Sequence, residues 1–425
     1  SKDGTRTNAG DLIYPARSQA EVDVDDLMPV AVVLEKASGD SKTHAYMTLA
    51  EAIAAAENGQ TVKLLSDVTI TGKQLVIEAG KQFTLDLNCK TLKISGYTAE
   101  AAQVDVFGDL TLADSSKAQN GTICSDYTGT AGLVVCVEAD GKLTMNGGTI
   151  TTEGMAKAGN ALKLAKNAVV TMNGGTVKCD AKRGNSAVNI ATGSETQFTM
   201  TGGSVIAEAG DRTETNITAI SGNFNSRIAI SGDSIVSGPQ AIFARNSSIS
   251  ITDGEFTGTI TVKNGISGGT FDRALDEKAC AAGFIPTKNE DGTYGVKQGA
   301  YVAEISGTKY ESLADAIAAA EKGQTVELLA DTAEDITIAA GQSITLDLNG
   351  KTLTNKADHT ITVEAGASLT INGEGTVDNV THAMAAIVNY GTVVLNGGTY
   401  TRSLENAENN KNDAGGNSYY TILND

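Results

Sequence analysis

The side chains that could do chemistry are mainly carboxylates. The densest acidic group of the chain contains Asp105, Asp109 and Asp114, and Lys117 follows closely in the sequence. Carboxylates gathered on one face can bind calcium, or they can exchange protons with a substrate as general acid and base. This group is therefore the first candidate for a calcium site or a catalytic site, although an ordinary solvated surface is the simpler interpretation.

Three other acidic features are weaker candidates. Asp86 and Asp347 alternate with leucines in two nearly identical segments, a period-two pattern that predicts outward-facing carboxylates on strands. Each occurs once and not in neighbouring repeats, so we interpret both as solvated or turn-bonding groups. Asp23–Asp26 has enough carboxylates to attract calcium but lacks the Gly and the distal Glu of an EF-hand loop.

Histidine and cysteine do not form a recognisable site. His44, His359 and His382 lie in unrelated contexts, without a Cys or carboxylate at metal-ligand spacing. The cysteines are odd in number and show no C-x-x-C spacing, so buried free thiols are expected, with one disulfide between adjacent repeats as the alternative. The cysteines are Cys89, Cys124, Cys136, Cys179 and Cys280. We predict no catalytic residue, no metal ligand, no cofactor-binding residue and no cofactor.

Composition narrows the possible partners. The 425 residues include 32 Lys and Arg against 51 Asp and Glu, a net charge of −19. The sequence contains no cluster of basic residues that could bind the phosphate groups of a nucleic acid. Nucleic acid is therefore not an expected partner. Apolar runs such as Leu133–Val137 are far shorter than the ~20 residues of a membrane span, so we predict no membrane insertion within this chain. Because the chain begins at Ser1 without a signal-peptide pattern, we expect that any targeting segment was removed or not included.

Internal repeats predict the elements that would position these side chains. One eight-residue phrase begins at Leu143 (LTMNGGTI) and returns in related form at Val170, Phe198 and Ile228, at intervals of 27 to 30 residues. Each copy has apolar residues in period two on either side of a glycine corner. Such a period fits about three short strands and their turns.

We therefore predict an all-β fold, a right-handed parallel β-helix with three strands per coil. Stacked coils should form interior columns of like side chains, and the corner side chains should stack as well, bonding to backbone groups at the bend. One expected column contains Leu143, Val170, Phe198, Ile228 and Ile249, and the next contains Met145, Met172, Met200, Ile230 and Ile251. The expected corner residues are Asn146, Asn173, Thr201, Ser231, Thr252 and Ser267. Leucine-rich repeats, helical solenoids and immunoglobulin-like sandwiches fit the pattern less well.

A longer repeat predicts two tandem solenoids. Residues 46–65 recur almost unchanged as residues 310–329, and each copy has the signals of a helix that would cap a solenoid, at about 48–58 and about 312–322. The expected divisions are an N-terminal arm, a first β-helix, a connecting hairpin or linker, and a second β-helix that ends in mid-pattern as if truncated. These divisions cover residues 1–28, 29–275, 276–300 and 301–425.

The chain resembles bacterial surface and secreted proteins with a pectin-lyase-like right-handed parallel β-helix, particularly adhesin-like repeat proteins of Gram-positive gut-type bacteria. The resemblance rests on the Asn-Gly-Gly-Thr corners, the strand pair at Thr345–Leu353, the cap helices and the join from Gly283 to Tyr294. It covers about residues 30–425 and implies a secreted or cell-surface location. It says little about activity, because one fold hosts many functions.

The function that we expect is non-catalytic: an adhesin-like binding or spacer module, monomeric, for a glycan or a host or matrix protein. Outward positions of the repeated strands are small and neutral, as at Thr144, Thr171 and Thr199, and the loops Asp211–Asn216 and Glu405–Asn417 would protrude. Threonine arrays also occur on ice-binding proteins, but here strand propensity explains them. The alternative is a polysaccharide lyase or glycoside hydrolase for an acidic or plant polysaccharide, although Trp is absent and only 4% of residues are aromatic.

Overall fold

The computed structural model shows an all-β chain with two short helices, divided into two compact units at residues 1–297 and 298–425. The structure describes residues 12–13, 29–34, 43–99, 101–129, 132–155, 159–180, 186–208, 217–404 and 420–425. The expected arm therefore lies outside the described residues, apart from β1 (Leu12–Ile13), which pairs with β3 (Thr43–Tyr46). The acidic segment Asp23–Asp26 and the loops Asp211–Asn216 and Glu405–Asn417 also lie outside them.

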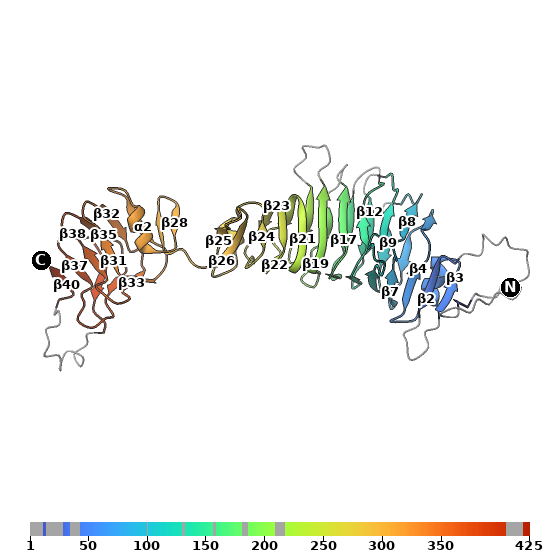
Figure 1. Cartoon of the computed structure of the whole chain (residues 1–425), viewed down its shortest axis with the longest axis horizontal. Coiled ribbons are helices and arrows are strands. Elements are labelled where there is room, and N and C mark those ends of the chain that lie inside the picture. The colour runs from blue at the N-terminus through green and yellow to red at the C-terminus, as the bar shows by residue number, and fades with distance from the viewer. Residues whose placement is uncertain are drawn as a thin grey trace, which may run out of the picture. The chain divides into compact units, whose positions relative to one another are not determined.

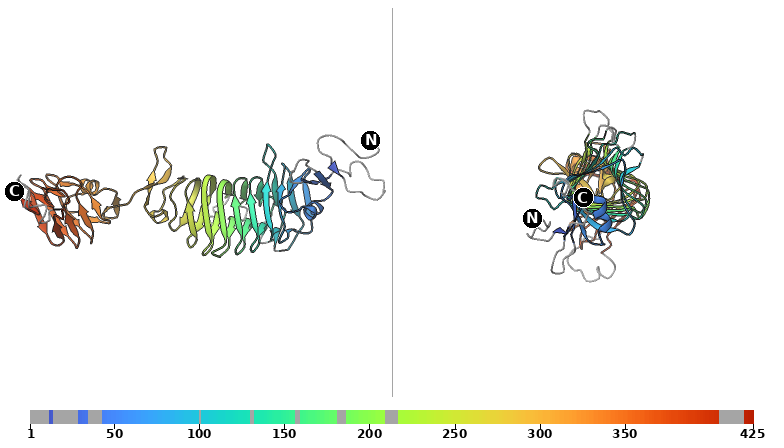
Figure 2. Two further views of the ribbon diagram at one scale, coloured as in Figure 1. Left: turned by 90° about the horizontal axis from the view of Figure 1, so that it is seen from below. Right: turned by 90° about the vertical axis from the view of Figure 1, so that its right-hand side faces the viewer.

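The first unit is a solenoid of parallel strands, each paired with a strand one coil away (Figure 1; Figure 2). Three series of strands follow one another along the chain and repeat. The first series contains β4 (Thr61–Leu64), β7 (Gln82–Asp86), β10 (Asp109–Ala113), β13 (Lys142–Met145) and β16 (Val169–Met172). The second contains β5 (Val68–Thr71), β8 (Thr91–Ser95), β11 (Thr122–Ser125), β14 (Thr149–Thr151) and β17 (Thr176–Asp180). The third contains β6 (Leu75–Ile77), β9 (Ala102–Val106), β12 (Leu133–Val137), β15 (Asn160–Leu164), β18 (Ser186–Ile190) and β20 (Thr218–Gly222).

Later coils of the first unit have longer strands that continue past the corner. Further strands are β19 (Gln197–Glu208), β21 (Arg227–Ala244), β22 (Ser248–Ile251), β23 (Glu255–Val262) and β24 (Thr270–Phe271). They continue the parallel pairing, which confirms the predicted all-β parallel solenoid.

The register confirms both predicted interior columns. Leu143 pairs with Val170, and Met145 with Met172, and the same two columns continue through β19, β21 and β22 to Ile249 and Ile251. All ten side chains are buried. Because no coil can cover its own apolar row, stacking is what removes these side chains from water.

The corners differ from the prediction in their hydrogen bonding. Asn173 donates from Nδ2 to Oδ1 of Asn146, and Thr201 donates from Oγ1 to Oδ1 of Asn173, so these side chains bond to one another. The expected backbone partners are already occupied, because the N–H of Asn173 donates to the carbonyl of Met145 in the previous coil. Only the weaker contact from Ser267 Oγ to the carbonyl of Ile251, at 3.4 Å, follows the expected pattern.

Both cap helices form, but they are shorter than expected: α1 is Leu49–Ala55 and α2 is Leu313–Ala319. Thr48 and Ser312 are the N-caps, and the side chain of each accepts a hydrogen bond from the N–H three residues on. The helices end early because the next residue is already extended, with φ −61° and ψ 126° at Ala56. The glycine that marks the C-terminal side, Gly59, has φ +85° in the turn beyond the helix. In the first unit, α1 contacts β2 (Ala31–Leu34), β3 and β4.

The second unit has three separate sheets, in which strands of successive coils pair in parallel (Figure 1). One sheet holds β29 (Thr325–Leu328), β32 (Ser343–Asp347), β35 (Ser368–Asn372) and β38 (Thr392–Leu395), preceded by the antiparallel pair β27 (Ala303–Ile305) and β28 (Thr308–Tyr310). The second holds β30 (Thr332–Ala333), β33 (Thr352–Thr354), β36 (Thr376–Asp378) and β39 (Thr399–Thr401). The third holds β31 (Ile336–Ile338), β34 (Ile361–Val363), β37 (Ile387–Asn389) and β40 (Ile422–Asn424).

The segment expected to connect the solenoids packs with the first unit. It contains the 3₁₀ helix η2 (Glu277–Ala279), β25 (Phe284–Lys288) and β26 (Tyr294–Gln298), and Gly292 takes φ +89° at the predicted turn. Tyr294 pairs antiparallel with Phe271 and packs against the core of the first unit. The segment up to Lys297 is therefore a terminal hairpin of that unit, because its apolar side chains are covered there.

Candidate functional site

One cluster on the first unit brings together three side chains able to hold a metal ion. Asp105 on β9 and Cys136 on β12 are register partners in adjacent coils, and Glu138 follows β12 directly. A carboxylate oxygen of each acid and Sγ of Cys136 all lie within 4.8 Å of one another. Among the described residues, this is the one group of three potential ligands at such separations.

Asp105 is held from one side by a short relay. Gln74 donates from Nε2 to Oδ2 of Asp105 at 3.0 Å, and the Tyr97 hydroxyl donates to Oε1 of Gln74 at 2.7 Å. Only 8% of Asp105 is exposed. Its second oxygen, Oδ1, is buried and accepts no hydrogen bond among the described residues. A buried carboxylate oxygen without a partner is unfavourable unless a proton or a cation reaches it.

Burial and a like charge shift the proton affinities in this cluster. Burial, and secondly the neighbouring Glu138 carboxylate, raise the pKa of Asp105 to about 6. Burial, followed by the same Glu138, also raises the pKa of the Cys136 thiol far above its usual range, while the Lys163 ammonium on β15 acts in the opposite direction. Both shifts have the same physical cause, which is ionisable groups buried beside a second carboxylate.

The acidic group predicted from the sequence is not brought together. Only Asp105 belongs to the cluster; Asp109 starts β10, Asp114 follows the end of that strand, and Lys117 is exposed. The Asp114 carboxylate accepts hydrogen bonds from backbone N–H groups of the corner, those of Cys89, Ser116 and Gly121. Burial acts to raise the pKa of Asp114, but the Ser116 side chain and these backbone hydrogen bonds together hold it below its usual range. Asp114 is thus a structural carboxylate.

Asp86 and Asp347 bond to turns, as expected. Asp86 accepts from the backbone N–H and the hydroxyl of Ser115 and lies 3.4 Å from the Lys63 ammonium. It is 4% exposed, so of the two expected roles, solvated or turn-bonding, Asp86 has the turn-bonding one. Asp347 accepts from the N–H of Asn349 at 2.9 Å.

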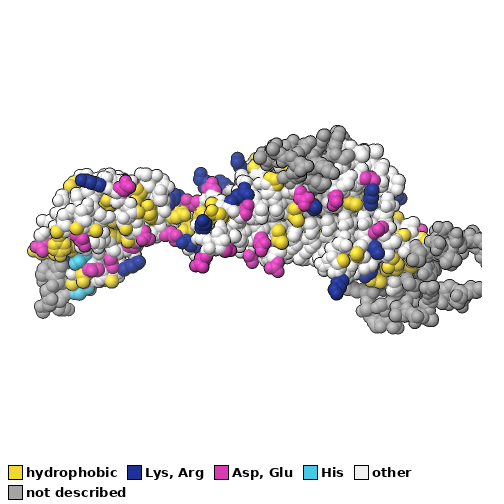
Figure 3. All heavy atoms as spheres, turned by 45° about the horizontal axis from the view of Figure 1, so that its top comes forward, with side chains coloured by type: hydrophobic (Ala, Val, Ile, Leu, Met, Phe, Trp, Pro, Cys, Tyr) yellow, Lys and Arg dark blue, Asp and Glu magenta, His cyan; other side chains and the backbone are white. Residues whose placement is uncertain are grey.

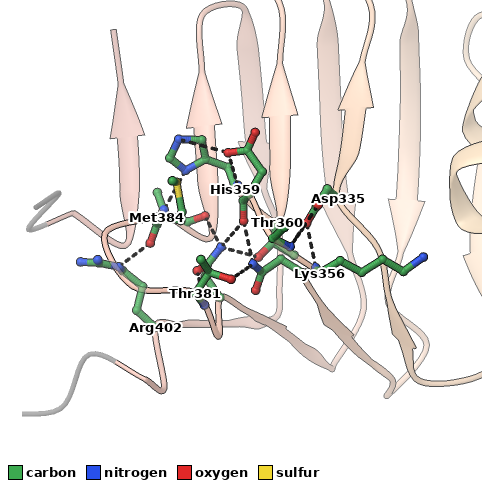
Figure 4. Close-up of polar contacts among 12 residues, drawn as sticks. Asp335, Lys356, His359, Thr360, Thr381, Met384 and Arg402 are labelled. Atoms are coloured by element: carbon green, nitrogen blue, oxygen red, sulfur yellow. Dashed lines mark hydrogen bonds and ion pairs between the residues drawn. The ribbon is translucent and has the colours of Figure 1, made fainter. Parts of the chain in front are cut away.

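The histidines do not join a ligand cluster among the described residues. Figure 4 shows His359 in a polar network at the corner between β33 and β34 of the second unit, where its Nδ1 accepts the N–H of Ala385 at 2.8 Å. Asn379 crosslinks the same corner by donating to the carbonyls of Asp358 and Ala385. Because most of these bonds satisfy backbone groups of the turns, and others join side chains of adjacent corners, this network stabilises stacked corners.

All five cysteines are free thiols, so the alternative of a disulfide between adjacent repeats is wrong, but the expectation of burial fails for the exposed Cys89 and the partly exposed Cys124. Cys136 and Cys179 are buried and Cys89 is exposed. Cys89 has φ +64°, where Gly350 stands in the second unit with φ +72°.

A cavity of about 730 Å³ lies beside α1 in the first unit. Its walls are largely apolar and include Leu49 and Ile53 of α1, Ile70 of β5 and Leu75 of β6, with Lys73 also lining it. The local sequence motifs predict neither this cavity nor the cluster that contains Asp105.

Hydroxyl groups form the most extensive ordered feature of the outward strand faces. In the first series, one column of threonines is in register over six strands, from β4 through β19. Its members are Thr61, Thr84, Thr111, Thr144, Thr171 and Thr199. A second column on the neighbouring series contains Thr91, Thr122, Thr149, Thr176 and Ser204. On the face shown in Figure 3, the charged side chains of the first unit are scattered and do not gather into one patch.

Comparison of the chain with protein families, curated proteins and solved structures finds no match. No helix among the described residues is long and apolar enough to span a membrane.

Proposed function

We propose that the protein is a non-catalytic, adhesin-like binding or spacer module, secreted or held at a bacterial cell surface, that presents its strand faces to a glycan or an extracellular protein. The observation that supports this most is the threonine column of the first series, in register from Thr61 to Thr199. Stacked strands repeat their side chains about every 4.8 Å, so the column offers regularly spaced hydroxyl groups. Hydroxyls both donate and accept hydrogen bonds, as a repetitive polar partner requires.

Binding of the whole chain to a glycan array and to matrix proteins tests this proposal. The variant Thr144→Val/Thr171→Val/Thr199→Val removes three hydroxyls from the column while keeping the side-chain shape and strand preference. We expect it to bind at least tenfold more weakly than the parent. The matched control, Thr122→Val/Thr149→Val/Thr176→Val, alters the neighbouring column and is expected to bind like the parent. Equal binding by the parent and both variants would contradict the role of this column.

The alternative, a polysaccharide lyase or glycoside hydrolase, is favoured by one observation. Asp105, with its pKa raised to about 6, stands beside Glu138, and a carboxyl that holds its proton near neutral pH can act as a general acid. Cleavage of pectin, alginate or host glycans that is abolished by Asp105→Asn would establish this function. The proposed binding module predicts no cleavage by the parent protein.

A further inference from the structure

The chemistry of the Asp105 cluster extends beyond the binding module. We propose that Asp105, Cys136 and Glu138 bind a thiophilic divalent cation, with Zn²⁺ as the best-fitting class. The two carboxylates and the thiol come from adjacent coils and converge within 4.8 Å. A combination of one soft sulfur ligand and two oxygen ligands suits zinc better than calcium or magnesium, which prefer oxygen alone.

The unpartnered oxygen is the second observation that points to a ligand. Asp105 is more than nine-tenths buried, and its Oδ1 has no hydrogen-bond partner among the described residues while Oδ2 accepts from Gln74. A second carboxylate, Glu138, lies beside it. Two adjacent carboxylates are mutually repulsive, so a cation between them would remove the repulsion and supply the missing partner of Oδ1.

The surroundings match those of a metal ligand. Outer hydrogen bonds commonly fix a ligating carboxylate, and the relay from Tyr97 through Gln74 does so for Asp105. Lys163 is the register partner of Cys136 in the next coil, and its positive charge offsets only part of the rise in the Cys136 pKa that burial and Glu138 cause, so a cation has to displace the thiol proton. Glu138 is partly exposed, which gives an ion a path from solvent, whereas Cys136 is buried.

The three ligand atoms have to move only slightly toward one another to bind one zinc ion. Ligand atoms around a tetrahedral zinc ion are about 3.5 Å apart, given Zn–S and Zn–O bonds of about 2.3 and 2.1 Å. Rotamer adjustments of about 1 Å would bring the three ligand atoms to that separation. Three protein ligands leave one position for a water molecule. On binding, the Cys136 thiol and any protonated carboxyl release their protons to the solvent, and no electrons are transferred.

Metal titration of the reduced, EDTA-treated full chain tests the site. With Co²⁺ as the probe, we expect a thiolate-to-cobalt charge-transfer band at one equivalent, and Zn²⁺ should displace it. Cys136→Ser should abolish the band and weaken Zn²⁺ binding at least 100-fold, whereas the matched control Cys179→Ser, which replaces another buried thiol, should keep both. Gln74→Ala should weaken Zn²⁺ binding about 10- to 100-fold while the band remains, because it removes only the outer support.

Three results would overturn the proposal: no band in the parent chain, unchanged Zn²⁺ affinity in Cys136→Ser, or tighter binding of Ca²⁺ or Mg²⁺ than of Zn²⁺. If Cys136→Ser does not fold, as judged by circular dichroism, Glu138→Gln replaces it, and Zn²⁺ affinity equal to that of the parent would refute the site. Zinc binding can fail while the parent still binds glycans, so these tests are independent of the proposed function.

Discussion

At the scale of single residues, the glycine corners determine whether the coils can stack. Gly175 has φ +81°, and a Cβ added to it would lie 2.6 Å from the carbonyl oxygen of Gly148 in the previous coil. Gly80 has nearly the same φ, +83°, but an added Cβ would meet nothing within 4 Å. Substitution of Gly80 therefore measures the cost of a positive φ alone, whereas substitution of Gly175 adds the cost of contact with the previous coil.

We expect Gly175→Ala to destabilise the protein by about 3 kcal/mol or more, because a left-handed alanine costs ~1–2 kcal/mol and the contact with Gly148 adds to it. The matched variant Gly80→Ala should cost only about 1 kcal/mol. Urea denaturation followed by circular dichroism measures both. Equal losses for the two variants would show that coil-to-coil contact at the corner does not matter.

The sequence predicts the position of a residue when similar side chains occupy the same place in successive coils. It does not predict the position of a residue that has no such counterpart. Leu143 and Met145 could be placed because each coil carries a similar side chain at the same position. Asp105 and Cys136 are register partners as well, but they differ in type and lie 31 residues apart. The strands AQVDV and LVVCV would have to be aligned to find them, and no repeated phrase marks that alignment. Asp109 and Asp114 are near Asp105 in the sequence, but the strand that holds Asp105 ends at Val106 and Asp109 begins the next strand, β10.

At the scale of elements, the two copies of the cap segment differ at a position that lies after each cap helix. Aligned without gaps from Tyr46 and Tyr310, Ile70 of the first unit corresponds to Glu334 of the second. Ile70 lines the cavity beside α1. Glu334 instead accepts hydrogen bonds from the N–H groups of Leu313 and Ala314 at the start of α2, at 2.8 and 3.0 Å. Its carboxylate also accepts from the hydroxyls of Ser312 and Thr332.

These bonds make α2 sensitive to pH. Burial acts to raise the pKa of Glu334, but the bonds from Leu313, Ala314, Ser312 and Thr332 together hold it below its usual value of 4.5. A carboxyl whose pKa is lower in the folded state stabilises the fold above the unfolded pKa, and this contribution is lost as pH falls through the folded pKa. Glu334 therefore stabilises the second unit at neutral pH.

We expect Glu334→Gln to destabilise the second unit by about 2 kcal/mol at pH 7, since a charged acceptor is lost from several donors. The difference from the parent should shrink below about pH 4.5, as the parent carboxyl also becomes neutral. Urea denaturation at pH 7 and pH 3.5 measures this. The exposed Glu374→Gln is the control and should have little effect at either pH. A difference for Glu334→Gln that is independent of pH would show that its charge is not the cause.

At the scale of the whole molecule, the chain contains two hydrophobic cores with no buried residue in common. Leu85 and Leu346 occupy matching places in the two cores. Leu85 lies in a column between Val62 and Leu112, and Leu346 lies between Val326 and Ile371. Both are at most 1% exposed. The chain also places all five cysteines in the first unit, at positions up to 280, so thiol reactivity reports on that unit alone.

Because the cores are separate, we expect each unit to unfold by its own transition. Leu346→Ala should lower the stability of the second unit by about 2–5 kcal/mol and leave unchanged the urea concentration at which Cys136 and Cys179 become reactive. Leu85→Ala, the matched variant, should lower that concentration. Thiol labelling across a urea series, with circular dichroism for total strand content, measures both effects. If Leu346→Ala exposed the thiols at a lower urea concentration, the unfolding of the two units would be coupled. Each stack of coils would then not be stable by itself.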